Sequence, residues 1–307
     1  MPFIKETFCL SYPKKAYAFL EDLGFSTKQS QKIIDKGRLR HNGNIVKKSQ
    51  ILQGDIELIH FKAQSLGLEP IFYNDDFCVY DKPHNLLIHP KGLFNHQSLN
   101  DCLKSRFGEQ ANPIHRLDYE TSGLVLCALH KKAEVELKNL FSQRAVTKTY
   151  TAIVRGIIKQ SEVCIDTPIV SCNNGKDLSI RSFVSLQGKP ALTQLKVLAR
   201  NEKNNQTLLC LIPITGRTHQ LRVHLDSINH PIIGDLLYGV NDECARAFLE
   251  SKRVARDIGT QPKVLPLMLN ASSLTFSYKH THFHFLSMLQ QDILRNFYTS
   301  SNSADGQ

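Results

Sequence analysis

Residues 113–126 read PIHRLDYETSGLVL, and this stretch decides the fold of the chain. A loop rich in charged and hydroxyl side chains leads directly into an apolar run, Gly123–Ala128, which is predicted as a buried β-strand. A rigid strand behind a polar loop is a good way to hold an acid, here Asp118, in a fixed place. Residue types alone nevertheless favour a plainer interpretation, in which Asp118 only caps a surface turn.

Comparable apolar runs and helical patterns occur from about residue 71 onward. The other predicted strands are Cys78–Tyr80, Lys148–Val154, Ala191–Ala199, Leu208–Ile212 and Ser273–Ser277. The predicted helices are Ser98–Phe107, Lys131–Ser142, Thr218–Ser227 and Asp242–Lys252. Because the strands do not alternate strictly with the helices, we predict an α+β fold with a mixed, largely antiparallel central sheet and flanking helices.

The preceding part of the chain has its own pattern of elements. The expected order is two helices, a hairpin, a turn and a strand. The signals are a helix cap at Ser26 or Thr27, the hairpin turn Asn42-Gly43, a turn at Gln53-Gly54-Asp55 and the strand Ile56–Phe61. We therefore place domains at residues 10–62 and 71–298, with a linker at 63–70 and a disordered tail at 299–307.

Charge and cysteine content narrow the class of protein. The 307 residues include 38 Lys and Arg against 28 Asp and Glu, so the formal net charge is +10. This excess favours a polyanionic partner, although a basic enzyme that never meets nucleic acid has the same balance. The 8 cysteines are dispersed and none forms a C-x-x-C pair, which is typical of reduced thiols. With no signal peptide and no membrane span in the sequence, we expect a cytoplasmic protein.

The stretch around Asp118 resembles the H-R-L-D-x-x-T-S-G signature of the RluA family of pseudouridine synthases, and every specified position matches. The resemblance implies that Asp118 is the catalytic residue. It also implies that Arg116 enters the RNA stack and helps to extrude the target uridine.

Two further motifs extend the resemblance. The run Gly216–His224 resembles the family's G-R-T-H-Q-[IL]-R-x-H motif, which implies that Arg217 pairs with Asp118 and that Leu221 packs near the target base. His219 and His224 lack the i, i+4 spacing of a metal-binding helix, so no metal is expected. Lys148-Thr149-Tyr150 resembles the family's K-x-Y motif, although by residue type alone Tyr150 is more often a core residue.

The remaining matches assign supporting roles. The resemblance implies that Tyr150 stacks on the target base and assists proton removal. Further motif positions are expected to bind substrate: His115, Thr121, Lys148 and His219. The segment Asp81–Pro90 resembles the opening segment of the family's catalytic domain, with Asn85 where glycine is usual. Asparagine tolerates a positive φ better than other residues with a side chain, so the turn is expected to survive.

The resemblance implies a pseudouridine synthase fold preceded by a small S4-like RNA-binding domain of mixed α and β structure. It also implies a monomer that isomerises uridine in large-subunit rRNA or, alternatively, in tRNA. The isomerisation needs no redox or electrophilic cofactor, and the sequence signals none. Asp118 would act either on C1′ or C6 as a nucleophile or at C2′ as a base, and both routes stay open. The competing hypotheses are a non-catalytic RNA-binding or ribosome-assembly factor and a base-releasing glycosidase.

Overall fold

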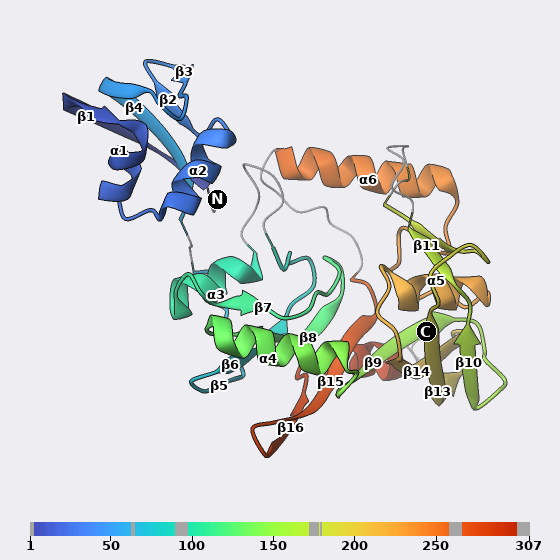
Figure 1. The fold of residues 1–307 in the computed structure, drawn as a ribbon. Coiled ribbons are helices and arrows are strands. Elements are labelled where there is room, and N and C mark those ends of the chain that lie inside the picture. The colour runs from blue at the N-terminus through green and yellow to red at the C-terminus, as the bar shows by residue number, and fades with distance from the viewer. Residues whose placement is uncertain are drawn as a thin grey trace. The chain divides into compact units, whose positions relative to one another are not determined.

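The computed structural model describes residues 3–62, 65–89, 98–171, 178, 180–257 and 266–299. The described chain divides into two compact units, one ending at Leu66 and the other beginning at Gly67 (Figure 1). Within the described ranges, no helix is both long and apolar enough to cross a membrane.

The N-terminal unit packs two helices, α1 (Ala16–Asp22) and α2 (Thr27–Asp35), against a four-stranded sheet. The strand order in the sheet is β1-β4-β2-β3. The strands are β1 (Phe3–Lys15), β2 (Leu39–His41), β3 (Asn44–Ile45) and β4 (Ile51–Phe61). Its core is a separate hydrophobic cluster that includes Phe19, Leu39 and Leu58.

Two local predictions for this unit are confirmed. Ser26 caps α2 in a reciprocal arrangement with Gln29, in which each side chain satisfies a free backbone N–H of the helix start. Asn42 and Gly43 both have positive φ, 49° and 79°, as a two-residue hairpin turn between β2 and β3 requires.

Two other predictions for this unit are wrong. A long strand, β1, begins at Phe3 and pairs with β4, so the unit starts before residue 10. The expected turn at residues 53–55 is instead part of β4, which runs unbroken from Ile51. Gly54, with φ of 89°, accommodates an irregularity where β1 shifts its register against β4. Gly54, which was predicted to lie in a turn, is therefore a strand residue.

The second unit is built on a ten-stranded mixed sheet, as predicted. Its main path is β10-β13-β14-β9-β15-β8-β6-β5, with β16 paired to β15 and β7 paired to β8. The strands are β5 (Phe72–Tyr73), β6 (Phe77–Lys82), β7 (Asn112–Pro113), β8 (Ser122–Ala128), β9 (Val146–Arg155), β10 (Glu162–Asp166), β13 (Leu192–Asn201), β14 (Gln206–Pro213), β15 (Leu269–Tyr278) and β16 (Thr281–Leu286). A separate two-stranded sheet joins β11 (Ile169–Ser171) to β12 (Ser182–Val184).

The described part of the second unit contains five helices. They are α3 (Leu99–Phe107), α4 (Lys131–Ser142), α5 (Gln220–Ser227), α6 (Asp242–Asp257) and α7 (Gln290–Thr299). All six predicted strands and four predicted helices of this unit are present, and α7 was not predicted. Asn85 has φ of 58°, so it takes the left-handed turn expected of it. The predicted tail, apart from Thr299 at the end of α7, lies outside the described residues.

One short parallel contact joins the two halves of the large sheet. All its strand pairs are antiparallel except β15 with β8, where Asn270 pairs with Ser122 and Ala271 with Gly123. Gly123 has φ of 111°, and a Cβ added there would lie 2.4 Å from the carbonyl oxygen of Ala271. Only glycine therefore allows the two strands to come this close. The loop that carries Asp118 ends directly at this contact.

Candidate catalytic site

Hydrogen bonds to the backbone fix the loop that carries Asp118. The backbone N–H of Thr121 donates to the carbonyl of Asp118 at 3.2 Å and closes a tight turn. Lys82, which is fully buried, donates from Nζ to the carbonyls of Pro83, Leu86 and Tyr119 at 2.9, 3.0 and 3.3 Å. The lysine therefore ties the residue after Asp118 to the neighbouring loop. Burial lowers the pKa of Lys82 to about 7, against the opposing charges of Glu120 and Asp118.

A buried polar network supports the strand behind the loop. Asn270, at the centre of the sheet, donates from Nδ2 to the hydroxyls of Ser122 at 3.0 Å and Ser287 at 3.1 Å. Ser287 in turn donates to the carboxylate of Asp81 at 2.8 Å. The amide of Asn270 therefore connects β15 to β8 and to the segment that follows β16.

Arg222 on α5 is the cation beside Asp118. Its Nε and Nη2 each donate to the carboxylate of Asp235 at 2.7 Å, a bidentate pair that is almost fully buried. Its Nη1 is 3.6 Å from Asp118 Oδ2 and also 3.6 Å from Glu120 Oε2. The guanidinium is therefore held by Asp235 and presents one N–H-bearing nitrogen between two carboxylates. The side chain of Asp118 stays 30% exposed.

The predicted ion pair between Arg217 and Asp118 is not formed among the described residues. The Arg217 side chain is exposed, and its Nε donates to the carbonyl of Pro190 at 3.0 Å. Arg217 lies before α5, whereas Arg222 is in the first turns of the helix with its side chain inward. The helix was predicted to begin at Thr218, but it begins at Gln220, after His219 with its left-handed φ of 55°. Because of this backbone turn, the side chain of Arg217 lies at the surface while that of Arg222 is buried.

His219 approaches the other oxygen of Asp118. Its Nε2 is 3.8 Å from Asp118 Oδ1, and its Nδ1 is 2.9 Å from the hydroxyl of Tyr238. The imidazole is 9% exposed. Burial lowers the pKa of His219 below its ordinary value, although Asp118 opposes the shift. The two oxygens of Asp118 thus face different partners, His219 and Arg222.

Apolar side chains lie next to these charges. Tyr150 on β9, Leu117 beside Asp118 and Leu221 on α5 are all buried and belong to one hydrophobic cluster. Burial, and then the nearby charge of Asp118, raise the pKa of Tyr150 well above its ordinary value. The phenol therefore stays protonated near neutral pH, and the expected part of Tyr150 in removing a proton stays a prediction. Asp118 thus lies near His219 and Tyr150, whereas Arg217, which was expected beside it, bonds to Pro190.

Three of the residues expected to bind substrate contact the protein instead. His115 Nε2 accepts a hydrogen bond from the Leu126 N–H at 3.1 Å, and its ring stacks on Phe141. Lys148 also lies over Phe141, with Nζ 5.4 Å from the ring centroid. Thr121 is 2% exposed, and its hydroxyl has no hydrogen-bond partner among the described residues. The expected contacts of these three residues with RNA stay predictions.

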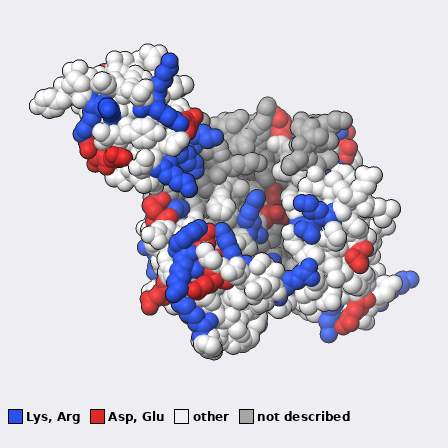
Figure 2. All heavy atoms as spheres, in the orientation of Figure 1, with Lys and Arg blue, Asp and Glu red and all other residues white. Residues whose placement is uncertain are grey.

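Arg116 is the exposed exception among the predicted RNA contacts. Burial lowers the pKa of His89 most, and the positive charges of Arg116, Lys104 and Lys138 lower it further. Lys104 and Lys138 pair with Glu109 and Glu134, whereas no ion pair of Arg116 is recorded among the described residues. Figure 2 shows Lys and Arg side chains spread over the visible face of this unit, with acidic side chains between them.

Comparisons with known proteins identify the family. The family model described as RNA pseudouridylate synthase matches residues 76–227. An uncharacterized RNA pseudouridine synthase of Helicobacter pylori is 46% identical over 281 residues, which cover 91% of this chain and 92% of that protein. The chain belongs to the RNA pseudouridine synthases. It is therefore an isomerase that acts on RNA.

More distant relatives agree with this assignment of the synthase. The dual-specificity RNA pseudouridine synthase RluA of Pasteurella multocida is 40% identical over 174 residues, 56% of this chain and 77% of that protein. The solved structure of human RNA pseudouridylate synthase domain containing 1 has a TM-score of 0.57 and 29% identity, covering 74% of this chain and 85% of that one. These relatives support the fold of the second unit.

Four residues around the site were missed as functional candidates of the synthase: Lys82, Arg222, Asp235 and Tyr238. Arg222 stands in the quoted motif Gly216–His224, and Asp235 and Tyr238 follow later in the chain, but no role was attached to them. A charged residue within an apolar helical face, such as Arg222 between Leu221 and Val223, is the signal that could have found one of them. Lys82 gives the same signal at the end of an apolar strand.

Proposed function

We propose that Asp118 is the essential residue with which the synthase converts uridine into pseudouridine in structured RNA. The observation that carries this proposal is the setting of its carboxylate. Arg222 and His219 face its two oxygens from the protein side, while 30% of the side chain stays open to a substrate. The guanidinium of Arg222 thus lies beside the carboxylate that either chemical route would use.

The apolar neighbours of Asp118 suit an extruded base. Tyr150 and Leu221 belong to the same cluster, and a protonated phenol ring can stack on uracil for about 1–3 kcal/mol. Flipping the nucleotide out of a helix costs a few kcal/mol, which such stacking offsets. Arg116 is exposed next to this cluster and is proposed to fill the gap that the base leaves in the RNA stack.

Arg217 keeps a proposed part in substrate binding. Because its guanidinium is exposed and bonded only to a backbone carbonyl among the described contacts, it can turn toward a phosphate of bound RNA. Arg222, rather than Arg217, provides the positive charge beside Asp118.

The N-terminal unit is proposed to add affinity for RNA. Lys28, Lys32 and Lys36 are exposed and follow one another at intervals of four residues, so they line one face of α2 and its C-terminal end. A row of lysines on a helix is suited to tracking phosphates. The likeness of this unit to an S4 domain favours large-subunit rRNA as the target, and tRNA is the alternative. The relatives named RluA are called dual-specificity synthases.

The decisive experiment measures tritium release from RNA labelled at C5 of uridine. Asp118→Asn should lower the single-turnover rate by about ten-thousandfold or more, while RNA affinity changes little. Asp166→Asn, at an exposed aspartate in β10, is the matched control and should retain full activity. Turnover by Asp118→Asn at more than a tenth of the wild-type rate would remove Asp118 from the mechanism.

A second experiment addresses the target. Ribosomal RNA and tRNA transcribed without modification would be treated with the synthase and mapped for pseudouridine at single-nucleotide resolution. We expect modification of large-subunit rRNA. Modification of tRNA alone would overturn the proposed target and leave the role of Asp118 intact.

A further inference from the structure

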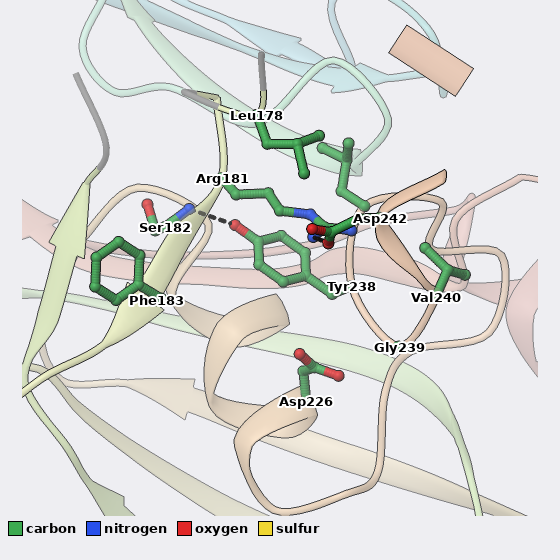
Figure 3. A pocket seen from close by; sticks show the side chains of 10 residues that line it. Leu178, Arg181, Ser182, Phe183, Asp226, Tyr238, Gly239, Val240 and Asp242 are labelled. Atoms are coloured by element: carbon green, nitrogen blue, oxygen red, sulfur yellow. Dashed lines mark hydrogen bonds and ion pairs between the residues drawn. The ribbon is translucent and has the colours of Figure 1, made fainter. Parts of the chain in front are cut away.

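Tyr238 connects His219 to the backbone of a different segment. Its hydroxyl oxygen is 2.8 Å from the backbone nitrogen of Ser182 in β12 and 2.9 Å from Nδ1 of His219. Figure 3 shows the Tyr238 ring with its hydroxyl directed at the Ser182 amide. The ring is 5% exposed, and it also lies against the guanidinium of Arg222, whose Cζ is 5.2 Å from the ring centroid.

The direction of the first hydrogen bond follows from its chemistry, and the direction of the second depends on the tautomer of His219. A backbone N–H can only donate, so the Tyr238 oxygen accepts from Ser182. Burial raises the pKa of Tyr238, so the phenol retains its hydrogen and can donate it to Nδ1 of His219. A neutral imidazole that accepts at Nδ1 carries its own hydrogen on Nε2. That nitrogen is the one facing Asp118, whose carboxylate only accepts.

We propose that Tyr238 is a positioning residue, which sets the tautomer of His219 so that the Nε2–H is directed at Oδ1 of Asp118. The present distance of 3.8 Å shortens to a hydrogen bond when substrate closes the site, as is common for catalytic contacts in unliganded enzymes. With Oδ1 held by His219 and Oδ2 beside Arg222, the orientation of the carboxylate is defined. This inference rests on the proposed role of Asp118 and adds how that residue is aimed.

The charges around His219 explain why a tyrosine is needed. Asp118, Glu120 and Asp235 favour a protonated imidazole, whereas burial and Arg222 disfavour it. Burial is the largest of these effects, and it lowers the pKa of His219. The neutral ring then has a hydrogen on only one nitrogen, and the Tyr238 hydroxyl decides which one. Without that hydroxyl, the hydrogen of the neutral ring can sit on either nitrogen. Protonation of His219 then restores a hydrogen on Nε2, because the charged ring carries hydrogens on both nitrogens.

The first test reads the tautomer directly in the whole free protein. ¹⁵N NMR of histidine-labelled synthase at pH 8 should show His219 with hydrogen on Nε2 and none on Nδ1, with the resonance assigned by its loss in His219→Gln. In Tyr238→Phe the two nitrogen shifts should move toward the values of a tautomer mixture. Tyr278→Phe is the matched control, because this buried tyrosine donates to Glu136 at 2.6 Å and belongs to another cluster. It should leave the His219 shifts unchanged.

The second test separates positioning from a structural role. At pH 8, Tyr238→Phe should lower kcat about tenfold or more with KM within about twofold, as loss of one hydrogen bond to a charged group predicts. Its activity should recover partly as the pH falls below the ordinary titration range of histidine, where a protonated His219 again donates from Nε2, and the wild type should show no such recovery. His219→Gln, which keeps a donor near the Nε2 position, should exceed His219→Ala in kcat.

These outcomes decide the inference. Because the NMR spectrum needs no turnover, an active Asp118→Asn would refute the catalytic assignment while leaving the observed tautomer in place. The positioning role of Tyr238 is overturned if His219 carries its hydrogen on Nδ1, or if Tyr238→Phe leaves both the tautomer and the pH profile unchanged. Equal activity of His219→Gln and His219→Ala would overturn it as well.

Discussion

Replacing Arg222 by methionine should destabilise the synthase because it leaves Asp235 buried without its cation. Asp235 is fully buried and receives two hydrogen bonds of 2.7 Å from Arg222. Removal of one partner from a buried ion pair costs about 3–5 kcal/mol. Asp235 keeps the backbone N–H groups of Leu237 and Tyr238 at 2.9 and 3.1 Å. These two donors place the expected loss near the lower end, at about 3 kcal/mol.

Thermal unfolding is a direct assay of this loss. The transition can be followed by near-ultraviolet circular dichroism of the 9 tyrosines, since the chain has no tryptophan. A domain of this size loses about 2–4 °C of Tm per kcal/mol, so Arg222→Met should melt about 6–12 °C below the wild type. Arg295→Met, at an exposed position in α7, is the control and should change stability by less than about 0.5 kcal/mol.

A double-mutant cycle tests the cause of the loss. Adding Asp235→Leu to Arg222→Met removes the stranded carboxylate, so the double variant should be more stable than the sum of the single losses predicts. A loss below about 1 kcal/mol for Arg222→Met, or strictly additive single effects, would refute the claim that the buried pair holds this part of the site.

Two more predictions concern the loop that carries Asp118. Lys82 has its pKa lowered from 10.5 to about 7 by burial, so between these pH values the unfolded chain binds the extra proton and stability rises with pH. The free energy of unfolding, measured in urea, should therefore rise by up to about 1.4 kcal/mol per pH unit more in the wild type than in Lys82→Met between pH 7 and 10. A difference between the two proteins that does not change with pH would contradict this. Gly123→Ala should cost at least about 2 kcal/mol in thermal unfolding and also lower activity, because its Cβ overlaps the backbone of Ala271. Gly108→Ala shares a positive φ but has open space around the added Cβ, so an equal loss there would show that backbone strain alone explains the effect.

The sequence predicts elements whose signals are local. The helix at Lys131–Ser142 was predicted with the bounds that the structure has, because its apolar spacing and its ends are both visible in the residues. The Asn42-Gly43 turn was equally clear. The strand β1 escaped prediction because its residues are at most half-buried, so polar and apolar side chains alternate with little contrast. Only its pairing with β4 reveals it.

The site was predictable as a set of residues and not as a set of contacts. The motifs place Asp118, Tyr150 and Leu221 together, and the structure agrees. Which arginine faces Asp118 depends on the left-handed turn at His219, a conformation that few residues other than glycine take. The pairing of Arg222 with Asp235, and of Tyr238 with Ser182, joins segments whose contacts no local pattern specifies.

The parallel contact between β8 and β15 has a consequence for how the enzyme is made. Ser122 and Asn270, which are linked there, are 148 residues apart in the chain. The strand that supports the loop carrying Asp118 therefore pairs across a long stretch of chain, and long-range pairings of this kind form slowly. A nascent chain that ends before β15 carries Asp118, Tyr150 and Arg222 but lacks the neighbour against which Gly123 packs. The loop that carries Asp118 therefore gains this support only after β15 has been made.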